Sequence, residues 1–224
     1  MKFDFVAPCY FGTESAAAFD FKRIGAENVA VTDGRVSFSG GADILAAANL
    51  YSRCAERILI RLASYPAKTF DELFDGVYAI PWEEYLPADA AFPVKGSSLS
   101  STLSSVPACQ SIVKKAVVER LKKGWRTGTL PETGGEYRIR FSLRKDVAEI
   151  FLDTSGDGLH KRGYRRNSTL APLKETLAAA MLDLGRVYPD STVQDPFCGS
   201  GTMCIEAAMK AMRIAPGLRR RFAA

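Results

Sequence analysis

The sequence Asp195-Pro196-Phe197-Cys198-Gly199-Ser200-Gly201-Thr202 lies near the end of the 224 residues and decides the fold of that region. Residues 192–194 before it predict the end of a short strand, and residues 203–212 after it predict a helix. Two glycines in a strand-to-helix turn let the backbone approach a ligand closely, and the start of the helix offers free N–H groups. An acidic residue at the strand end can accept hydrogen bonds from a ligand's amine or hydroxyls. The stretch therefore predicts a nucleotide-type cofactor site, made of Asp195, Pro196, Phe197, Cys198, Gly199, Ser200, Gly201 and Thr202.

The predicted helix after this turn carries an apolar stripe that we expect to face inward, formed by Ile205, Ala208, Met209 and Met212. An ordinary glycine-rich turn of any Rossmann-like domain is the alternative explanation of the stretch. The dinucleotide-binding fingerprint fits poorly, because no third glycine follows Gly201 at the required spacing.

Residues 195–202, together with Ile205-Glu206-Ala207-Ala208, resemble the first cofactor motif of S-adenosylmethionine-dependent RNA methyltransferases. The resemblance is to the bacterial THUMP-domain-containing family that methylates the exocyclic N2 of guanine in large-subunit (23S) ribosomal RNA. It implies that S-adenosyl-L-methionine is the cofactor and that Asp195, Gly199 and Gly201 hold it.

The composition favours a protein with a sizeable core and without a membrane span. Hydrophobic residues make up 47% of the sequence, yet no run of 18 apolar residues occurs. Asp4 comes too early for a signal peptide. The five cysteines are scattered, and none forms a Cys-x-x-Cys pair. We therefore expect reduced thiols, a cytoplasmic location and no metal site.

The net charge of +5 is unevenly distributed along the sequence. Residues 1–92 hold 8 Lys and Arg against 13 Asp and Glu, whereas residues 93–224 hold 22 against 12. A basic second part behind an acidic first part favours a polyanion as partner of the second part. Basic residues that only solvate one face are the alternative.

Residues 1–64 predict the order βαββαβ of a ferredoxin-like domain. Thr13 and Asp43 are expected to cap its two helices, and Asp33-Gly34 marks a hairpin turn. Residues 57–63 read either as the final strand or as a continuation of the second helix. Because this part is acidic, we expect it to act as a spacer or docking domain.

Residues 65–160 predict a second domain with two helices and several strands. The expected elements are a short helix after Thr69, a strand near residues 92–96, a hydroxyl-rich loop at 97–105, a helix from Ser105 to about Lys123, and two strands at 136–144 and 147–153. The region resembles the THUMP domain, a module that binds RNA beside RNA-modifying catalytic domains. The resemblance rests on Lys95 with the serine-rich loop, on residues 106–117 and on Thr154-Ser155-Gly156.

The predicted RNA contacts fall into two sets of mostly basic residues. The first belongs to the THUMP-like region, and the second to the basic stretch that follows it: Lys95, Ser98, Lys114 and Lys115, then Lys161, Arg162, Tyr164 and Arg165. Lysines and serines at a helix start can bind phosphates without reading bases. A solvated helix face is the alternative for Lys114 and Lys115. His160, the single histidine, is interpreted as structural or RNA-facing.

Residues 171–182 predict a further helix, which in the resembling family borders the cofactor. Its start, Leu170-Ala171-Pro172, is a candidate cofactor contact, with plain core packing as the alternative. Leu173, Leu177, Ala180 and Met181 are expected to pack inward.

The expected fold class is α/β with an α+β N-terminal part. Its predicted domains are ferredoxin-like (1–64), THUMP RNA-binding (65–160) and an incomplete Rossmann-like methyltransferase domain (161–224). The Asn-Pro-Pro-Tyr motif that holds the target base in amino-methylating relatives is absent from the sequence. We therefore expect a fragment that is inactive alone. The alternatives are a truncated RNA-binding module and a related enzyme acting on transfer RNA or DNA.

Overall fold

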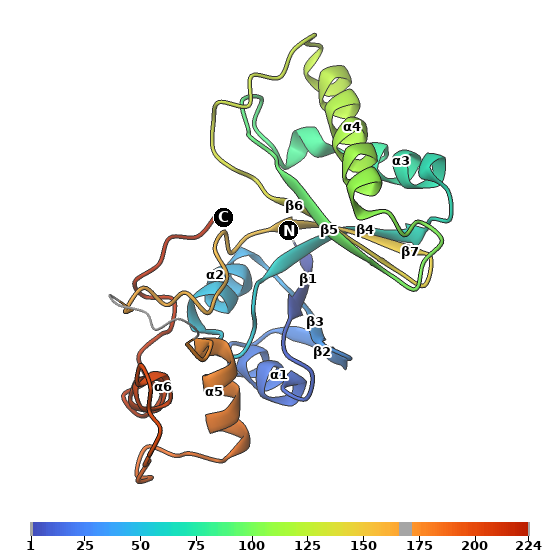
Figure 1. The fold of residues 1–224 in the computed structure, drawn as a ribbon. Helices are drawn as coiled ribbons and strands as arrows, with labels where there is room; N and C mark the ends of the chain where they lie inside the picture. The colour runs from blue at the N-terminus through green and yellow to red at the C-terminus, as the bar shows by residue number, and fades with distance from the viewer. Residues whose placement is uncertain (1, 166–171, 224) are drawn as a thin grey trace. The chain divides into compact units, whose positions relative to one another are not determined.

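The computed structural model describes residues 2–165 and 172–223, which form two compact units (Figure 1). Unit 1 contains the residues up to Leu59 together with Ser155–Phe222, and unit 2 contains Ile60–Thr154 together with Ala223. Unit 1 is therefore divided between two long segments of the sequence, whereas unit 2 is one continuous stretch apart from Ala223. Mixed helices and strands in both units confirm the expected α/β class.

The first part of unit 1 has the elements β1 (Phe3–Pro8), α1 (Glu14–Arg23), β2 (Glu27–Thr32), β3 (Arg35–Gly40) and α2 (Ala42–Tyr51). With β4 (Leu59–Pro66) next in the chain, the predicted order βαββαβ is confirmed. The strands of unit 1 lie in the order β2-β3-β1, and both pairs are antiparallel. Phe5, Phe21 and Phe38 are buried at the centre, with 4.1 Å between the ring centroids of Phe21 and Phe38.

The helix starts of this part differ from the predicted caps. Thr13 is the N-cap of α1, but its hydroxyl donates to the carbonyl of Tyr10 at 2.7 Å and makes no cap hydrogen bond. Gly41, and not Asp43, is the N-cap of α2. Residues 57–63, which the sequence left open, contain the start of β4.

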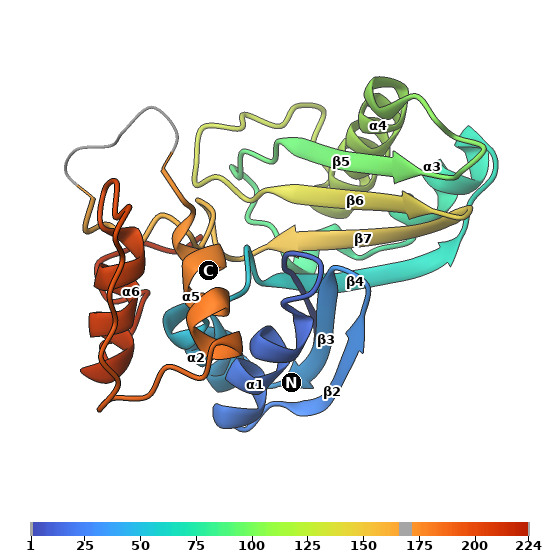
Figure 2. The same ribbon diagram turned by 60° about the horizontal axis from the view of Figure 1, so that its bottom comes forward.

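Unit 2 contains a sheet with the strand order β4-β7-β6-β5 (Figure 2). The remaining strands are β5 (Val94–Leu99), β6 (Ile139–Arg144) and β7 (Val147–Asp153). β6 pairs antiparallel with β7, and β5 pairs parallel with β6. The helices α3 (Phe70–Tyr78) and α4 (Val106–Trp125) pack against each other and lie behind the sheet in Figure 2, with the short η1 (Trp82–Glu84) between them in sequence.

The patterns predicted for unit 2 hold, except for the bounds of two strands. Val113, Val117 and Leu121 of α4 are fully or almost fully buried, as their spacing predicts. Thr69 begins α3 with a complete capping box to Glu72. The strand predicted at 136–144 begins only at Ile139, and residues 97–99 extend β5 to Leu99 where a loop was predicted. Their pairing with β6 supplies backbone partners that a sequence pattern does not reveal.

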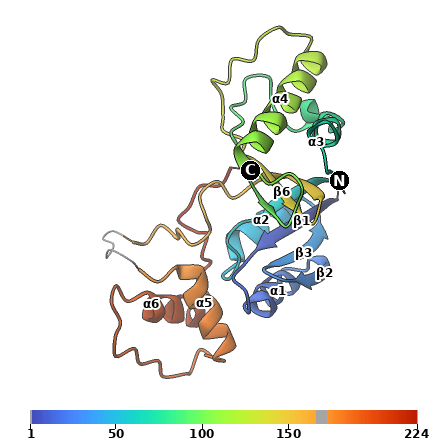
Figure 3. The ribbon, with the colours of Figure 1, turned by 45° about the vertical axis from the view of Figure 1, so that its right-hand side comes forward.

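The last part of unit 1 consists of α5 (Glu175–Leu184) and α6 (Thr202–Ala211), which pack side by side (Figure 3). The strand predicted at residues 192–194 is not formed, and those residues have no ladder partner in the described part of the chain. A single strand without a partner leaves its N–H and C=O groups to water and is not stable.

The buried faces of these two helices also differ from the prediction. In α6 the buried residues are Thr202, Glu206 and Ala207, whereas Met212 at its end is 71% exposed. In α5 Ala180 is buried as predicted, but Met181 is 47% exposed. Polar residues thus occupy the inner side of α6 in place of the predicted apolar stripe.

Among the described helices, none is both long and apolar enough to span a membrane. In the same described residues, no three potential metal ligands of the His, Cys, Asp or Glu type cluster together.

Candidate cofactor turn and its contacts

The turn before α6 has the backbone that its glycines predict. Gly199 and Gly201 have φ angles of +52° and +74°, in the left-handed region that favours glycine, and Gly201 is the N-cap of α6. A Cβ at either position would meet nothing closer than 3.8 Å, so the conformation and not crowding requires glycine there. Gly201 has no side chain that could cap the first turn of α6, which suits its N–H groups to a ligand.

The residues before the turn are open to solvent. Phe197 is 93% exposed, and Pro196 and Cys198 are also exposed. Asp195 accepts a hydrogen bond from the backbone N–H of Phe197 at 3.1 Å through Oδ1, which fixes the start of the turn. Together, the carboxylate, the open turn and the helix start fit a nucleotide-type cofactor: Asp195 suits amine or hydroxyl donors, and the N–H groups suit acceptors or negative charge.

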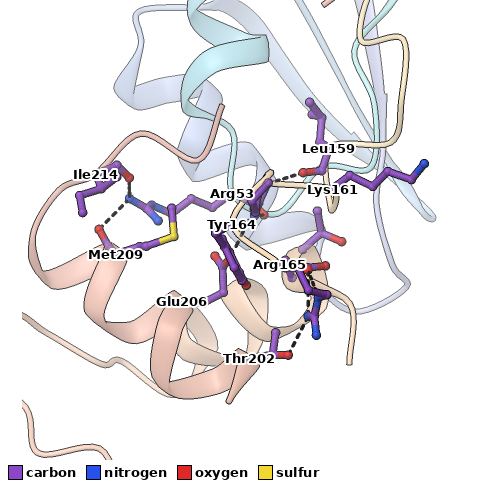
Figure 4. A network of polar contacts seen from close by, with 12 residues as sticks. Arg53, Leu159, Lys161, Tyr164, Arg165, Thr202, Glu206, Met209 and Ile214 are labelled. Carbon is purple, nitrogen blue, oxygen red and sulfur yellow. Dashed lines mark hydrogen bonds and ion pairs between the residues drawn. The ribbon is translucent and has the colours of Figure 1, made fainter. Parts of the chain in front are cut away.

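The basic stretch before α5 lies against this turn and against α6 (Figure 4). Arg162 is 2% exposed, and its guanidinium lies 3.4 Å from a carboxylate oxygen of Glu206, which is 1% exposed. The same guanidinium donates to the carbonyls of Leu159 at 2.8 Å and Arg53 at 2.5 Å. The prediction that Arg162 contacts RNA is therefore wrong for this structure, because its side chain is buried and its N–H groups are occupied within unit 1.

Tyr164 and Arg165 continue the same network. The Tyr164 hydroxyl donates to Glu206 Oε1 at 3.2 Å, and burial raises the pKa of this tyrosine. Burial likewise raises the pKa of Glu206, although Arg162 acts in the opposite direction. Arg165 bonds to Glu175 of α5 and to the hydroxyls of Ser200 and Thr202. Three of the residues predicted to hold RNA thus contact the methyltransferase-like segment itself.

Arg53 completes the network at the other end of α6. Its Nη2 donates to the carbonyls of Ile214 at 2.7 Å and Met209 at 3.3 Å (Figure 4). The Met209 carbonyl also accepts from the backbone N–H of Ile214 at 2.9 Å, so Arg53 is its second donor, and the positive charge of Arg53 complements the helix dipole. Arg53, Glu175 and Glu206 were missed by the sequence reasoning. The one available signal was Glu206, a charged residue among small apolar ones in a short helix.

His160 lies beside Glu56, with 3.7 Å between Nδ1 and the carboxylate. Burial lowers the pKa of this histidine below its usual value, which favours the neutral imidazole. This position within unit 1 agrees with the structural interpretation of His160. Of the candidate cofactor contact Leu170-Ala171-Pro172, the first two residues lie outside the described part of the chain, and Pro172 is partly exposed.

The RNA candidates of unit 2 differ in how available they are. Lys95 on β5 and Lys115 on α4 are exposed, the latter with a 3.8 Å contact to Glu119. Lys114 instead bonds to Glu132 at 2.7 Å and lies 3.5 Å from the centre of the Phe92 ring. The Ser98 hydroxyl donates to the carbonyl of Leu103 at 2.7 Å. In unit 1, Lys161 is exposed beside Asp157.

Three family models match successive segments of the chain. An RlmL ferredoxin-like domain matches residues 4–59, a THUMP domain matches residues 67–153, and an RMKL-like methyltransferase domain matches residues 162–224. The order of the three matches is the order that the sequence predicts.

Individual proteins agree with these matches. The chain is 49% identical over 223 residues to YpsC of Bacillus subtilis (strain 168), which is named as a candidate RNA methyltransferase. The aligned region covers 99% of this chain and 58% of YpsC. The chain is 39% identical over 217 residues to ribosomal RNA large subunit methyltransferase K/L of Magnetococcus marinus, covering 94% of this chain and 30% of that protein. The solved structure of SMU.472, a candidate methyltransferase complexed with SAH, has a TM-score of 0.92 and 46% identity, covering 99% of this chain and 59% of that one. The chain thus spans less than two thirds of the length of these relatives.

Proposed function

We propose that this chain, which belongs to the RlmKL family of RNA methyltransferases, supplies the RNA-binding part and the beginning of the cofactor site of an enzyme. The complete enzyme transfers a methyl group from S-adenosylmethionine to the exocyclic N2 of a guanine in 23S ribosomal RNA. As part of this proposal, its domains run from 1 to 64, from 65 to 160 and from 161 onward, and it works in the cytoplasm.

The glycine turn at the start of α6 is the observation that carries the proposal. Gly199 and Gly201 adopt left-handed backbone angles, and the N-cap Gly201 has no side chain to cap the N–H groups that follow. A relative with 46% identity was solved with SAH, the molecule that remains when S-adenosylmethionine has given up its methyl group. We assign Asp195 to the donor groups of the cofactor and the turn N–H groups to its acceptors.

The chemistry needs positioning more than acid–base groups. When bound, the cofactor supplies a methyl group on a positively charged sulfur, which makes the thioether a good leaving group. The chain's own contribution is to hold the cofactor through Asp195, Gly199 and Gly201, and to hold RNA through exposed cations. Lys95 and Lys115 of unit 2 and Lys161 of unit 1 suit that role, because their ammonium groups are exposed and can neutralise phosphates.

We further propose that the 224 residues alone transfer no methyl group. The sequence lacks the Asn-Pro-Pro-Tyr motif that would hold a flipped guanine. The chain should nevertheless bind RNA, with an affinity that falls steeply as the salt concentration rises.

Incubation with radiolabelled S-adenosylmethionine and RNA tests the proposal. The chain and a complete relative such as YpsC are each mixed with 23S ribosomal RNA, transfer RNA and DNA, and the labelled nucleoside is identified by mass spectrometry. We expect N2-methylguanine in 23S RNA with the relative and no label with the chain. If only transfer RNA is labelled, transfer RNA and not 23S RNA is the substrate. If the chain alone labels any RNA, the proposal that it is inactive is wrong. If the chain binds RNA in a salt-dependent way but the relative binds no SAH, the alternative function of an RNA-binding module is favoured.

A further inference from the structure

We propose that Arg165 is a positioning residue that fixes the candidate cofactor turn by holding the hydroxyl groups of Ser200 and Thr202. The assignment rests on the proposed function for the identity of the turn as the cofactor site. It gives Arg165 a different task from the RNA contact predicted from the sequence.

The contacts of Arg165 with the turn are direct (Figure 4). Its Nη1 donates to Ser200 Oγ at 2.7 Å, and its Nη2 donates to Thr202 Oγ1 at 3.0 Å. These two hydroxyls are also 3.3 Å from each other, so one guanidinium holds both residues that flank Gly201. Thr202 is 3% exposed, which places its bond to Arg165 where water competes little.

The guanidinium is itself anchored on its other side. Its Nε donates to Glu175 Oε1 at 3.0 Å, and Glu175 is 6% exposed at the first position of α5. Arg165 thus joins the start of α5 to the start of α6. Three acceptors around one planar group fix its orientation, which a lysine ammonium at the end of a flexible chain would not reproduce.

The backbone that carries Arg165 is also held in place. The preceding residue, Tyr164, bonds through its hydroxyl to Glu206 of α6. Arg162, three residues before Arg165, forms the buried ion pair with the same Glu206. The backbone just before Arg165 is therefore held to α6 at two residues, which keeps Arg165 beside the turn.

The turn needs such a restraint because its own residues provide little. Glycine has access to many backbone conformations, and both glycines of the turn occupy the left-handed region. The residues before it, Phe197 and Cys198, are exposed and add little packing. A binding loop that is ordered before the ligand arrives loses less entropy on binding. The consequence is that Arg165 increases cofactor affinity without touching the cofactor.

Hydrogen–deuterium exchange of the 224-residue chain, read by mass spectrometry in the peptide covering residues 198–204, tests this assignment. Arg165→Ala removes the donor, and Ser200→Ala with Thr202→Val removes the two acceptors while leaving Arg165 paired with Glu175. We expect each to increase the exchange rate of this peptide about tenfold, with Arg165→Lys close to Arg165→Ala. Combining both changes should add nothing further, because they remove the same contacts.

Arg23→Ala is the matched control, since it removes an exposed guanidinium of unit 1 that lies on α1. It should leave the exchange of residues 198–204 unchanged. If Arg165→Ala accelerates exchange throughout unit 1 while the double change of Ser200 and Thr202 has no effect on the peptide, Arg165 only stabilises the fold and the proposal is overturned. Unchanged exchange in both variants also overturns it.

Isothermal titration with SAH, using a complete relative such as YpsC with the equivalent changes, separates this proposal from the proposed function. A dissociation constant raised about tenfold by the arginine change supports the positioning role. If the unaltered relative binds no SAH, the proposed function fails while the exchange result still decides whether Arg165 orders the turn. If SAH binding is unaltered by the arginine change although exchange rises, the effect on affinity is refuted.

Discussion

Unit 2 and the α5–α6 segment bury their helices in opposite ways. In unit 2, the inner side of α4 is an apolar stripe that packs with α3 beside the sheet, and Val113, Val117 and Leu121 are almost completely buried. In α6 the inner side is polar, with Thr202 and Glu206 buried and Met212 exposed. The comparison teaches that hydrophobic periodicity locates a buried face only where its partner is apolar. Where the partner is a basic segment, an ion pair decides which side faces inward.

The largest expected effect comes from breaking that ion pair. Arg162→Ala leaves the Glu206 carboxylate buried without its cation, and this should lower the free energy of unfolding of unit 1 by about 4 kcal/mol. The change is measured by unfolding the chain in urea and monitoring hydrogen–deuterium exchange in peptides of unit 1. Replacing Arg162 and Glu206 together by methionines should cost much less. An equal loss in both variants would mean that shape and not charge orients α6.

Truncating a residue of the apolar α4 stripe should lower the free energy of unfolding of unit 2 by almost as much. Leu121 is 1% exposed, so Leu121→Ala removes buried apolar surface and leaves a cavity. We expect a loss of about 3 kcal/mol in the free energy of unfolding of unit 2, measured by urea unfolding. Substituting the exposed Lys115 on the same helix by Ala is the control and should change little. A loss below that of the control would show that the stripe does not stabilise unit 2.

The pH dependence of unit 1 extends the comparison to a second buried carboxyl group. Burial raises the pKa of Asp20 to about 6, although the backbone N–H groups of Arg53 and Cys54 donate to it. Since the folded pKa exceeds the unfolded one, folding favours the protonated form, and the Asp20 contribution to stability is lost as the pH rises from 4 to 6. The free energy of unfolding should fall by roughly 2 kcal/mol over that range, measured at several pH values. Asp20→Asn should flatten the decline. A stability that rises equally in both proteins over this range would exclude the linkage.

The smallest effect is expected for the residue that the pattern placed inside. Met212 belongs to the predicted apolar stripe but is 71% exposed. Met212→Ala should change the free energy of unfolding by less than about 0.5 kcal/mol in thermal unfolding of the chain. A loss comparable to that of Leu121→Ala would restore the stripe as the buried face.

The elements with regular patterns and local signals could be predicted from the sequence. The ferredoxin-like order, the Thr69 capping box and the stripe of α4 follow from residues that are close in the sequence. The backbone of the glycine turn also follows, because its conformation is a property of Gly199 and Gly201 themselves. These features depend on local geometry and on burial against apolar partners.

The remaining site could not be predicted, because it depends on partners far apart in the chain. Arg162 and Glu206 are separated by 44 residues, and Arg165 and Thr202 by 37. A basic stretch looks the same in a sequence whether its cations face RNA or buried carboxylates. Met181 shows the related limit for α5, since its spacing predicts a core position but the residue is 47% exposed.

The discontinuity of unit 1 has a consequence for the order in which the chain folds during synthesis. When Leu59 leaves the ribosome, the residues that pair with the backbone carbonyls of Ser52 and Arg53 have not been made, because they lie beyond Ser155. Unit 2 meets almost no such delay, since all of its residues except Ala223 are consecutive. At a translation rate of about 5 to 20 residues per second, the first part of unit 1 waits roughly 5 to 20 s for its partners. In nascent chains, unit 2 should therefore become resistant to proteolysis before α1 and α2. The ferredoxin-like part is then the segment for which a chaperone would matter most.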